Sequence, residues 1–182
     1  GFDLGGSDRK AAAVMDGKVI FAEEIAWTPY FERDPAYHVA GVQDSLRRAA
    51  AHLPRVDAIG GSAAGVYVNN EPRVGSLFRG VSPAAFETTI RPMFATLRAQ
   101  WNNVPFEVAN DGEVTALAGS MSLGTNAVLG VSMGTSQAGG YVTPEGRITT
   151  WLNELAFVPV DYSAAAPCDE WSGDAGCGVN YF

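Results

Sequence analysis

The chain has 182 residues, enough for one ordinary domain or slightly more. Hydrophobic residues make up 47% and charged residues 18%, so the composition supports a buried core and excludes an intrinsically disordered chain. Twelve Lys and Arg residues against twenty Asp and Glu residues give a net charge of −8. Because no basic cluster is visible that could neutralise a phosphate backbone, we expect no nucleic-acid partner.

The apolar runs are all too short to span a bilayer, so we expect no membrane partner. Two cysteines cannot form a disulfide framework for a chain of this size, which indicates a reduced, cytoplasmic protein. The sequence starts at Gly1 without a methionine and shows no secretory signal. We expect the chain to be a piece of a longer protein.

The first quarter of the chain predicts three antiparallel strands joined by two tight turns. We expect strands over residues 1–4, 10–15 and 19–25, with a glycine turn at residues 5–7 and a hairpin turn at 16–17. A helix follows, with Asp34 as its N-cap, Pro35 at its first position and Pro54 beyond its end. Its apolar stripe is formed by Val39, Val42, Leu46, Ala49 and Leu53.

The middle of the chain predicts a short buried strand over residues 56–60. The small residues 60–65 suit close backbone approach and not a strand interior, and residues 67–82 are expected to be irregular. A second long helix begins after Ser82, and Pro92 inside its apolar pattern predicts a kink or break near Arg91.

The last elements are a strand over 106–109, a helix that ends near Gly119, a strand over 126–132, a glycine-rich turn over 133–140 and a strand over 141–142. The resulting order, βββαβαβα followed by a new strand-turn-strand, predicts an α/β layered fold with a mixed sheet. We expect an N-terminal lobe over residues 1–120 and the incomplete start of a second lobe over 121–182.

The first group of residues that can carry chemistry is the turn between the first two strands. Backbone N–H groups of a glycine turn can converge on an anion, Ser7 adds a hydroxyl donor, and Asp3 can orient Mg²⁺ through water. The alternative is a plain β-turn with an exposed Asp. The residues concerned are Asp3, Gly5, Gly6, Ser7 and Lys10.

Residues 130–141 again predict a strand, a turn of small residues and a strand. The two turns can hold a polyphosphate between them. The alternative is an ordinary glycine-rich hairpin. The residues predicted to line the phosphates are Gly134, Thr135 and Ser136.

A third group stands where a strand ends and a helix begins, which is where ligands bind in open α/β sheets. Asp111 can accept a proton from a substrate hydroxyl while Asn110 hydrogen-bonds a neighbouring hydroxyl. The alternative for Asp111 is a plain helix N-cap, and for Glu113 a first-turn carboxylate favoured by the helix dipole. Cys168 and Cys177 do not make a zinc site without further ligands, and we interpret them as two reduced thiols.

Taken together, these motifs resemble those of the ROK family of sugar kinases, within the actin-like, sugar-kinase and heat-shock-chaperone ATPase fold. The resemblance implies a ribonuclease-H-like first lobe. Its first phosphate motif matches Asp3-x-Gly5-Gly6-Ser7-x-x-Lys10, its Asn-Asp motif matches Asn110-Asp111, and its second phosphate motif matches residues 133–140. The order and spacing of the three motifs agree with the family over almost the whole chain.

Two segments depart from the family pattern. The family motif Gly-Glu-x-Gly-His keeps its acid as Glu154, but Phe157 stands where the His would be. The zinc segment of the family survives only in part, so we predict no zinc site. Family members continue through further helices that hold the adenosine, and we expect this chain to lack most of the second lobe.

The resemblance implies transfer of the γ-phosphoryl group of ATP to a hydroxyl of a hexose or hexose derivative, with Mg²⁺ as cofactor and a homodimer as the assembly. Asp111 would be the general base and Asn110 and Glu154 would be sugar ligands. We also predict that Gly65 contacts the substrate.

The altered Phe157 and cysteine segments favour an alternative, a non-catalytic sugar-sensing relative with a degenerate site. Repressors of the family carry a DNA-reading helix pair ahead of the kinase-like part, and we expect none here. The sequence leaves open which sugar is used and whether the donor is ATP or polyphosphate.

Overall fold

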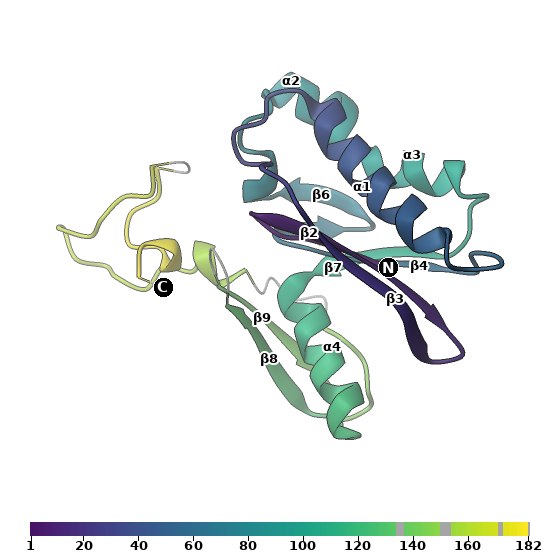
Figure 1. The fold of residues 1–182 in the computed structure, drawn as a ribbon. Coiled ribbons are helices and arrows are strands. Elements are labelled where there is room, and N and C mark those ends of the chain that lie inside the picture. The colour runs from purple at the N-terminus through teal and green to yellow at the C-terminus, as the bar shows by residue number, and fades with distance from the viewer. Residues whose placement is uncertain (134–136, 150–153, 171–172, 182) are drawn as a thin grey trace. The chain divides into compact units, whose positions relative to one another are not determined.

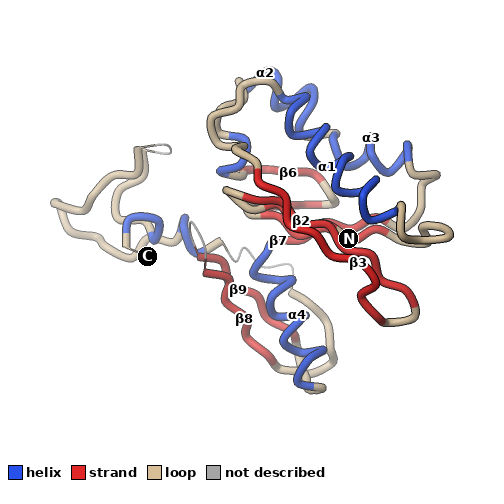
Figure 2. The backbone as a smooth tube through the Cα atoms, in the orientation of Figure 1, coloured by secondary structure: helices blue, strands red, loops and turns tan. Residues whose placement is uncertain are grey.

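The computed structural model describes residues 1–133, 137–149, 154–170 and 173–181. The chain forms two compact units, Gly1–Ala109 and Asn110–Phe182. Figure 1 shows their elements in chain order, and Figure 2 shows them by type of secondary structure. None of the described helices is both long and apolar enough to cross a membrane.

The first unit is built on a five-stranded mixed sheet whose strand order is β3-β2-β1-β4-β7. β1 pairs antiparallel with β2 and parallel with β4, which confirms the predicted mixed α/β class. The five strands are β1 (Phe2–Leu4), β2 (Asp8–Met15), β3 (Lys18–Ala26), β4 (Ile59–Ala63) and β7 (Phe106–Asn110).

The helices of the first unit are α1 (Pro35–Ala50), α2 (Pro83–Ala85) and α3 (Met93–Gln100), and they lie on one face of the sheet (Figure 1). Asp34 caps α1 as predicted, because its carboxylate accepts a hydrogen bond from Ala36 N at 2.9 Å. The predicted break before α3 is also confirmed. α2 continues as a π-helical turn (Phe86–Ile90), and the helix is interrupted at Pro92, which precedes α3.

The glycine-rich residues after Ile59 form strand β4, so the expectation that they could not be a strand interior was wrong. Gly61 pairs with Phe2 of β1 across the sheet. A Cβ atom at Gly61 would collide with the Phe2 ring, since it would lie 2.5 Å from Phe2 Cε2 and closer still to Cζ. The aromatic core therefore requires the small residue, and the glycine marks close packing of Phe2 and not flexibility.

The segment expected to be irregular contains a hairpin of β5 (Val66–Val68) and β6 (Glu71–Val74), followed by a 3-10 turn (Ser76–Phe78). Asn69 and Asn70 form its two-residue turn with φ of 55° and 61°, the left-handed conformation that Asn tolerates. The Asn70 side chain also anchors the hairpin to β7, because it donates to Phe106 O at 2.9 Å and accepts from Val108 N at 2.6 Å.

The second unit consists of helix α4 (Asp111–Leu123) packed on the antiparallel hairpin of β8 (Val128–Met133) and β9 (Gln137–Val142). Two 3-10 turns follow, Leu155–Phe157 and Gly178–Asn180. The helix runs past Gly119 and ends at Gly124, which has a left-handed φ of 64°. Because α4 packs on β8 and β9, it belongs to the second compact unit, which begins at Asn110. The division into lobes at residue 120 stays a prediction.

Glycines 139 and 140 lie within β9 and not in a turn, contrary to the sequence interpretation. A Cβ atom at Gly140 would lie 2.5 Å from Glu113 Cα, and one at Gly130 would lie 2.5 Å from Ala116 Cα. From the helix side, a Cβ atom at Gly112 would lie 2.7 Å from the Ala138 carbonyl carbon. The helix and the hairpin therefore touch backbone to backbone, which only glycine permits.

We expect Gly140→Ala to lower the free energy of unfolding by about 1–3 kcal/mol, because the added methyl group would meet helix backbone that no rotamer change can move. The matched control is Gly139→Ala, one residue away on the opposite face of β9. Its Cβ atom would meet nothing closer than 3.8 Å, and we expect a change below about 1 kcal/mol. Urea unfolding of both variants checks this, and equal midpoints would contradict the packing argument.

Candidate functional site

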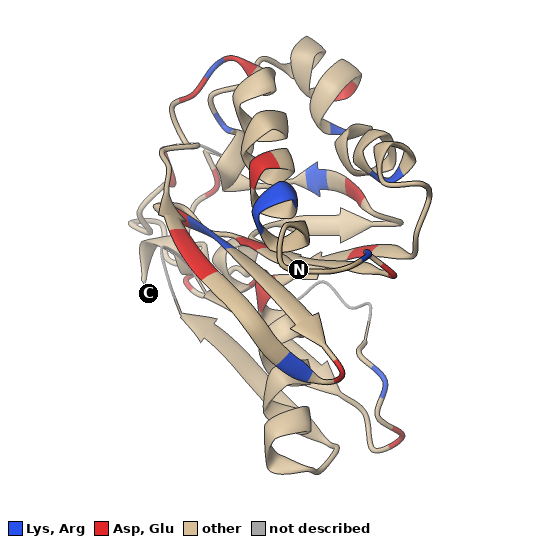
Figure 3. Ribbon diagram, turned by 45° about the vertical axis from the view of Figure 1, so that its right-hand side comes forward, with Lys and Arg blue, Asp and Glu red and all other residues tan. Residues whose placement is uncertain are grey.

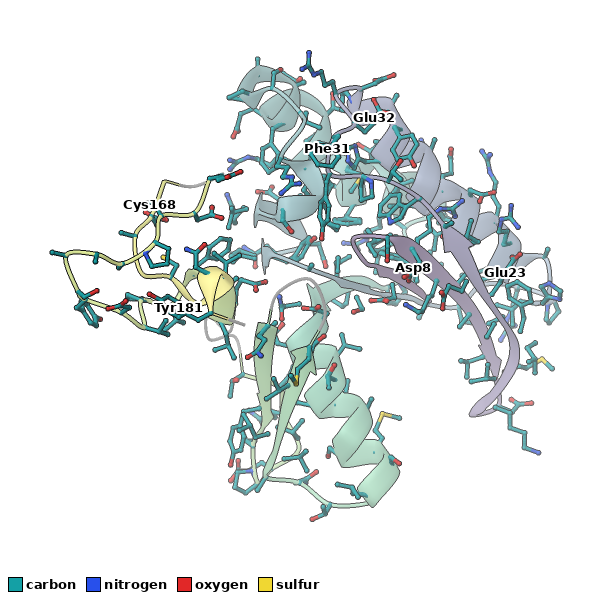
Figure 4. All side chains as sticks on the ribbon, turned by 60° about the vertical axis from the view of Figure 1, so that its left-hand side comes forward. Asp8, Glu23, Phe31, Glu32, Cys168 and Tyr181 are labelled. Atoms are coloured by element: carbon teal, nitrogen blue, oxygen red, sulfur yellow. The ribbon has the colours of Figure 1, made fainter. Side chains whose placement is uncertain are left out.

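The turn between β1 and β2 brings one cation between two carboxylates. Asp3 and Lys10 are register partners, and Lys10 Nζ lies 3.5 Å from Asp3 Oδ2 and 2.6 Å from Asp8 Oδ1. Asp8 is labelled in Figure 4. The hydrogen bond from Lys10 lowers the pKa of the Asp8 carboxyl, and the same bond raises the pKa of the Lys10 amine. Lys10 is thus held as a cation, with its side chain about half exposed.

The backbone of this turn retains donors that can meet an anion. Gly5 N–H is used inside the turn, where it donates to Asp8 O at 2.9 Å, and Ser7 Oγ donates to Asp8 Oδ2 at 3.1 Å. The amides of Gly6 and Ser7 have no acceptor among the residues that the structure describes. Two backbone donors therefore remain on the turn, and the Lys10 ammonium group lies next to it on β2, an arrangement that suits phosphate oxygens.

Aromatic side chains contact this turn and support its conformation. Trp27 Nε1 donates to Gly5 O at 2.8 Å. Any side chain at Gly6 would collide with the Tyr30 ring, since a Cβ atom there would lie 2.5 Å from Tyr30 Cζ. The guanidinium of Arg79 lies 4.7 Å from the ring centres of both Tyr30 and Phe31. Phe31 is labelled in Figure 4, on the loop between β3 and α1. The sequence interpretation missed these supports, which only the folded chain reveals.

The start of α4 shows which residue is the helix N-cap, a role that the sequence left open for Asp111. Asn110, not Asp111, is the N-cap: its side chain accepts from Gly112 N at 2.8 Å, and Glu113 Oε2 accepts from Asn110 N at 3.3 Å. Burial raises the pKa of the Glu113 carboxyl. Asp111 is the first helical residue and half-buried, and its two oxygens accept from Gly112 N at 3.1 Å and from Ser132 Oγ at 3.2 Å.

Glu154 and Asn110, both predicted to contact a sugar, come together although they are 44 residues apart in the chain. Asn110 Nδ2 donates to Glu154 Oε2 at 3.3 Å, and both residues are buried. Glu154 is placed there by an isolated bridge to Ala138 of β9. The second unit therefore gathers Asn110, Asp111 and Glu154 around the start of α4, together with Ser132, which the sequence analysis missed.

The remaining predicted residues divide into two cases. Gly134, Thr135 and Ser136 lie outside the described residues. Gly65 belongs to the first unit and has a φ of 119°, and a Cβ atom there would lie 2.5 Å from Val74 O. The close approach of β6 thus accounts for the glycine at position 65 without a ligand, and its contact with substrate stays a prediction.

The cysteines are free thiols, with Cys168 exposed (labelled in Figure 4) and Cys177 buried. Within residues 1–133, 137–149, 154–170 and 173–181, no group of three or more His, Cys, Asp and Glu side chains is placed to hold a metal ion. The predicted role of Asp3, to orient Mg²⁺ through water, stays a prediction.

The charge arrangement at the glycine turn predicts a pH dependence of stability. The folded protein lowers the pKa of Asp8, so the ionised carboxylate stabilises the fold at any pH above the pKa that Asp8 has in the unfolded chain. That stability is lost as the pH falls through the lowered pKa of the folded protein. We expect Asp8→Asn to destabilise the protein at pH 7, with the difference from the wild type shrinking below about pH 4.

Thermal unfolding from pH 2 to pH 7 measures this difference. In a Lys10→Met background the pH dependence of the Asp8→Asn effect should shrink, because the hydrogen bond from Lys10 is the largest cause of the lowered pKa and the Ser7 hydroxyl is a smaller one. A pH dependence that is undiminished without Lys10 would contradict this account.

No protein-family model and no curated protein matches the sequence. Solved structures do match its fold. The ROK family glucokinase of Streptomyces griseus, in complex with glucose and AMPPNP, gives a TM-score of 0.71 at 19% identity over 97% of this chain and 54% of that chain. The ROK hexokinase of Thermus thermophilus gives 0.65 at 21% identity, over 97% and 57% of the two chains.

A ROK family transcriptional regulator, a homologue of the E. coli Mlc protein, gives a TM-score of 0.66 at 19% identity over 97% of this chain and 44% of that chain. The chain thus spans about half the length of the structures that it resembles. Kinases and a regulator share this architecture, so the fold alone does not separate their activities. The chain has the mixed α/β fold of these ROK family structures.

Proposed function

We propose that the whole protein is a sugar kinase of the ROK type, which transfers the γ-phosphoryl group of ATP to a hydroxyl of a hexose or hexose derivative. The observation that carries this proposal is the placement of Asp111. Its carboxylate is half-buried at the first position of α4, it is free of the capping role that Asn110 fills, and it lies beside the hydrogen-bonded pair of Asn110 and Glu154. A carboxylate next to polar side chains suits proton abstraction from a polyhydroxyl substrate.

In this proposal Asp111 accepts the proton of the sugar hydroxyl while the oxygen of that hydroxyl forms the new bond to the γ-phosphorus. The bond from the γ-phosphorus to the β,γ-bridging oxygen breaks, and ADP leaves with that electron pair. Asn110 and Glu154 fix the orientation of the sugar through its neighbouring hydroxyls. Catalysis of this kind depends on position and charge stabilisation, because the protein forms no covalent bond to the substrate.

The glycine turn of the first unit supplies donors for the nucleotide phosphates. The amides of Gly6 and Ser7, the Ser7 hydroxyl and the Lys10 ammonium group are the residues that would hold phosphate oxygens. Asp3 would hold Mg²⁺ through water, and the ion, when bound, neutralises charge on the phosphates. The assignment of Gly134, Thr135 and Ser136 to the same phosphates belongs to this proposal as well.

The second candidate is a sugar-binding regulator that needs no nucleotide. Phe157, in the 3-10 turn after Glu154, stands where the resembling family motif has a His, so one hydrogen-bonding group for the sugar is replaced by an apolar ring. One of the similar folds is that of a transcriptional regulator. The kinase remains the better-supported reading, because a sensor has no need for a general base at Asp111.

We expect Asp111→Asn in the full-length protein to lower kcat by about 10²–10⁴-fold while sugar binding is largely kept, because the amide cannot accept the proton. The matched control is Glu113→Gln, the same isosteric change two residues further on. Glu113 completes the capping box, a role that Gln also fills, so its variant should keep kcat within about threefold. Steady-state kinetics measure both; equal kcat for Asp111→Asn and the wild type would refute the assignment.

Calorimetry separates the two candidate functions. For a kinase, we expect Mg²⁺-ATP or AMPPNP with Mg²⁺ to bind the full-length protein, and Lys10→Met to weaken that binding about tenfold or more because one charge-assisted contact is lost. A sensor should bind a hexose with unchanged affinity in the presence and absence of nucleotide. Hexose binding without any nucleotide heat would favour the regulator.

A further inference from the structure

Ser132 occupies a defined place between the proposed base and the second glycine-rich bend. It lies on β8 opposite Ala138 of β9, two residues before Gly134. Alternate residues of a strand share a face, so Ser132 lies on the same side as Gly130, which touches α4. The neighbouring residues Val131 and Met133 are exposed on the opposite side. The hydroxyl of Ser132 is therefore directed to α4, where it donates to Asp111 Oδ2 at 3.2 Å.

The distance between these two side chains is set by backbone packing. Gly130 lies against Ala116 in the second turn of α4, and Gly112, next to Asp111, lies against the backbone of Ala138. These contacts clamp the first turns of the helix onto the hairpin on both sides of Ser132. The Asp111 carboxylate has little freedom to leave the hydroxyl, because the elements that carry the two groups cannot shift apart without opening this packing.

We propose that Ser132 is a positioning residue, which holds the Asp111 carboxylate in the orientation that proton abstraction requires. This inference rests on the proposed kinase function and adds a residue to it. Asp111 Oδ1 is turned to Gly112 N and Oδ2 to Ser132 Oγ, so the two donors fix the plane of the carboxylate. Ser132 also lies two residues before Gly134 in the sequence, so the contact is close along the chain to the residues proposed to bind phosphate.

A lost positioning contact has a recognisable kinetic signature. The hydrogen bond acts on the geometry of the reacting group, so its loss should slow the chemical step and leave sugar affinity unchanged. In the full-length protein we expect Ser132→Ala to lower kcat about 10- to 100-fold, with the sugar KM within about twofold of the wild type. Ser132→Thr restores the hydroxyl and should recover most of kcat.

The control for a merely structural effect is Ser120→Ala on the same helix. Ser120 is buried and donates to Thr125 O at 2.7 Å, so its variant also removes a serine hydrogen bond of α4 but lies at the far end from Asp111. It should lower the unfolding midpoint and leave kcat unchanged. If Ser132→Ala leaves kcat unchanged, or if Ser132→Thr loses as much activity as Ser132→Ala, the proposal is overturned.

A second measurement needs no activity and separates failure of this proposal from failure of the kinase proposal. The side-chain carboxyl ¹³C resonance of Asp111 should shift in Ser132→Ala, return in Ser132→Thr, and stay in place in Ser120→Ala. A full-length protein that phosphorylates no hexose would sink the kinase function, while a shifted resonance would still support the Ser132 contact. If the Asp111 resonance is unchanged in Ser132→Ala, the proposed contact is wrong, whatever the activity of the variant.

Discussion

Backbone-to-backbone packing of α4 on the β8–β9 hairpin is the constraint on which the candidate site depends. Gly112, Gly130 and Gly140 remove the side chains that would otherwise separate the helix from the strands. Ser132 and the first residue of α4 come within hydrogen-bonding distance for this reason. Beyond its first turn α4 carries no charged residue (Figure 3), so the polar chemistry of the helix is concentrated at the end that this packing positions.

The start of α4 shows how one turn of helix can serve folding and chemistry at once. The exposed backbone N–H groups of a helix start need acceptors, and Asn110 and Glu113 supply a capping box for them. Asp111 stands between these two residues and takes little part in the cap, although Asp is a common N-cap residue. The buried hydrogen bond from Asn110 to Glu154 then extends the polar group to residues far along the chain. The capping box is made by Asn110 and Glu113, and the proposed general base, Asp111, lies between them.

Local chemistry made part of this fold predictable from the sequence. Asp34 with Pro35, Ser82 with Pro83, and the break at Pro92 all act within a few residues of themselves, so their consequences could be deduced without the fold. Asn110 and Asp111 were expected at the start of a helix for the same reason. The contact of Asn110 with Glu154 depends on the bridge between Glu154 and Ala138, a tertiary pairing that no local pattern encodes.

Glycine was the residue whose meaning the sequence could not decide, because it serves both loose turns and tight packing. Gly61 was expected to lie outside a strand interior and Gly140 in a turn, yet both lie in strands where neighbouring backbone or an aromatic ring fills the space of a Cβ atom. Asn69 and Asn70 carry a genuine turn signal, but the strands on either side are only three and four residues long and show little alternation. The partner of each glycine lies far away in sequence, so its role appears only in the folded chain.

The two glycine-rich motifs, which look alike in sequence, are therefore not equivalent in structure. In the first, Gly5 closes the turn and the amides of Gly6 and Ser7 lack acceptors among the described residues, so donors remain for an anion. In the second, Gly140 is used up in contact with α4 and cannot also face a ligand from that side. The phosphate role of Gly134, Thr135 and Ser136 stays a prediction, and Ser132, which precedes them in the chain, is hydrogen-bonded to Asp111.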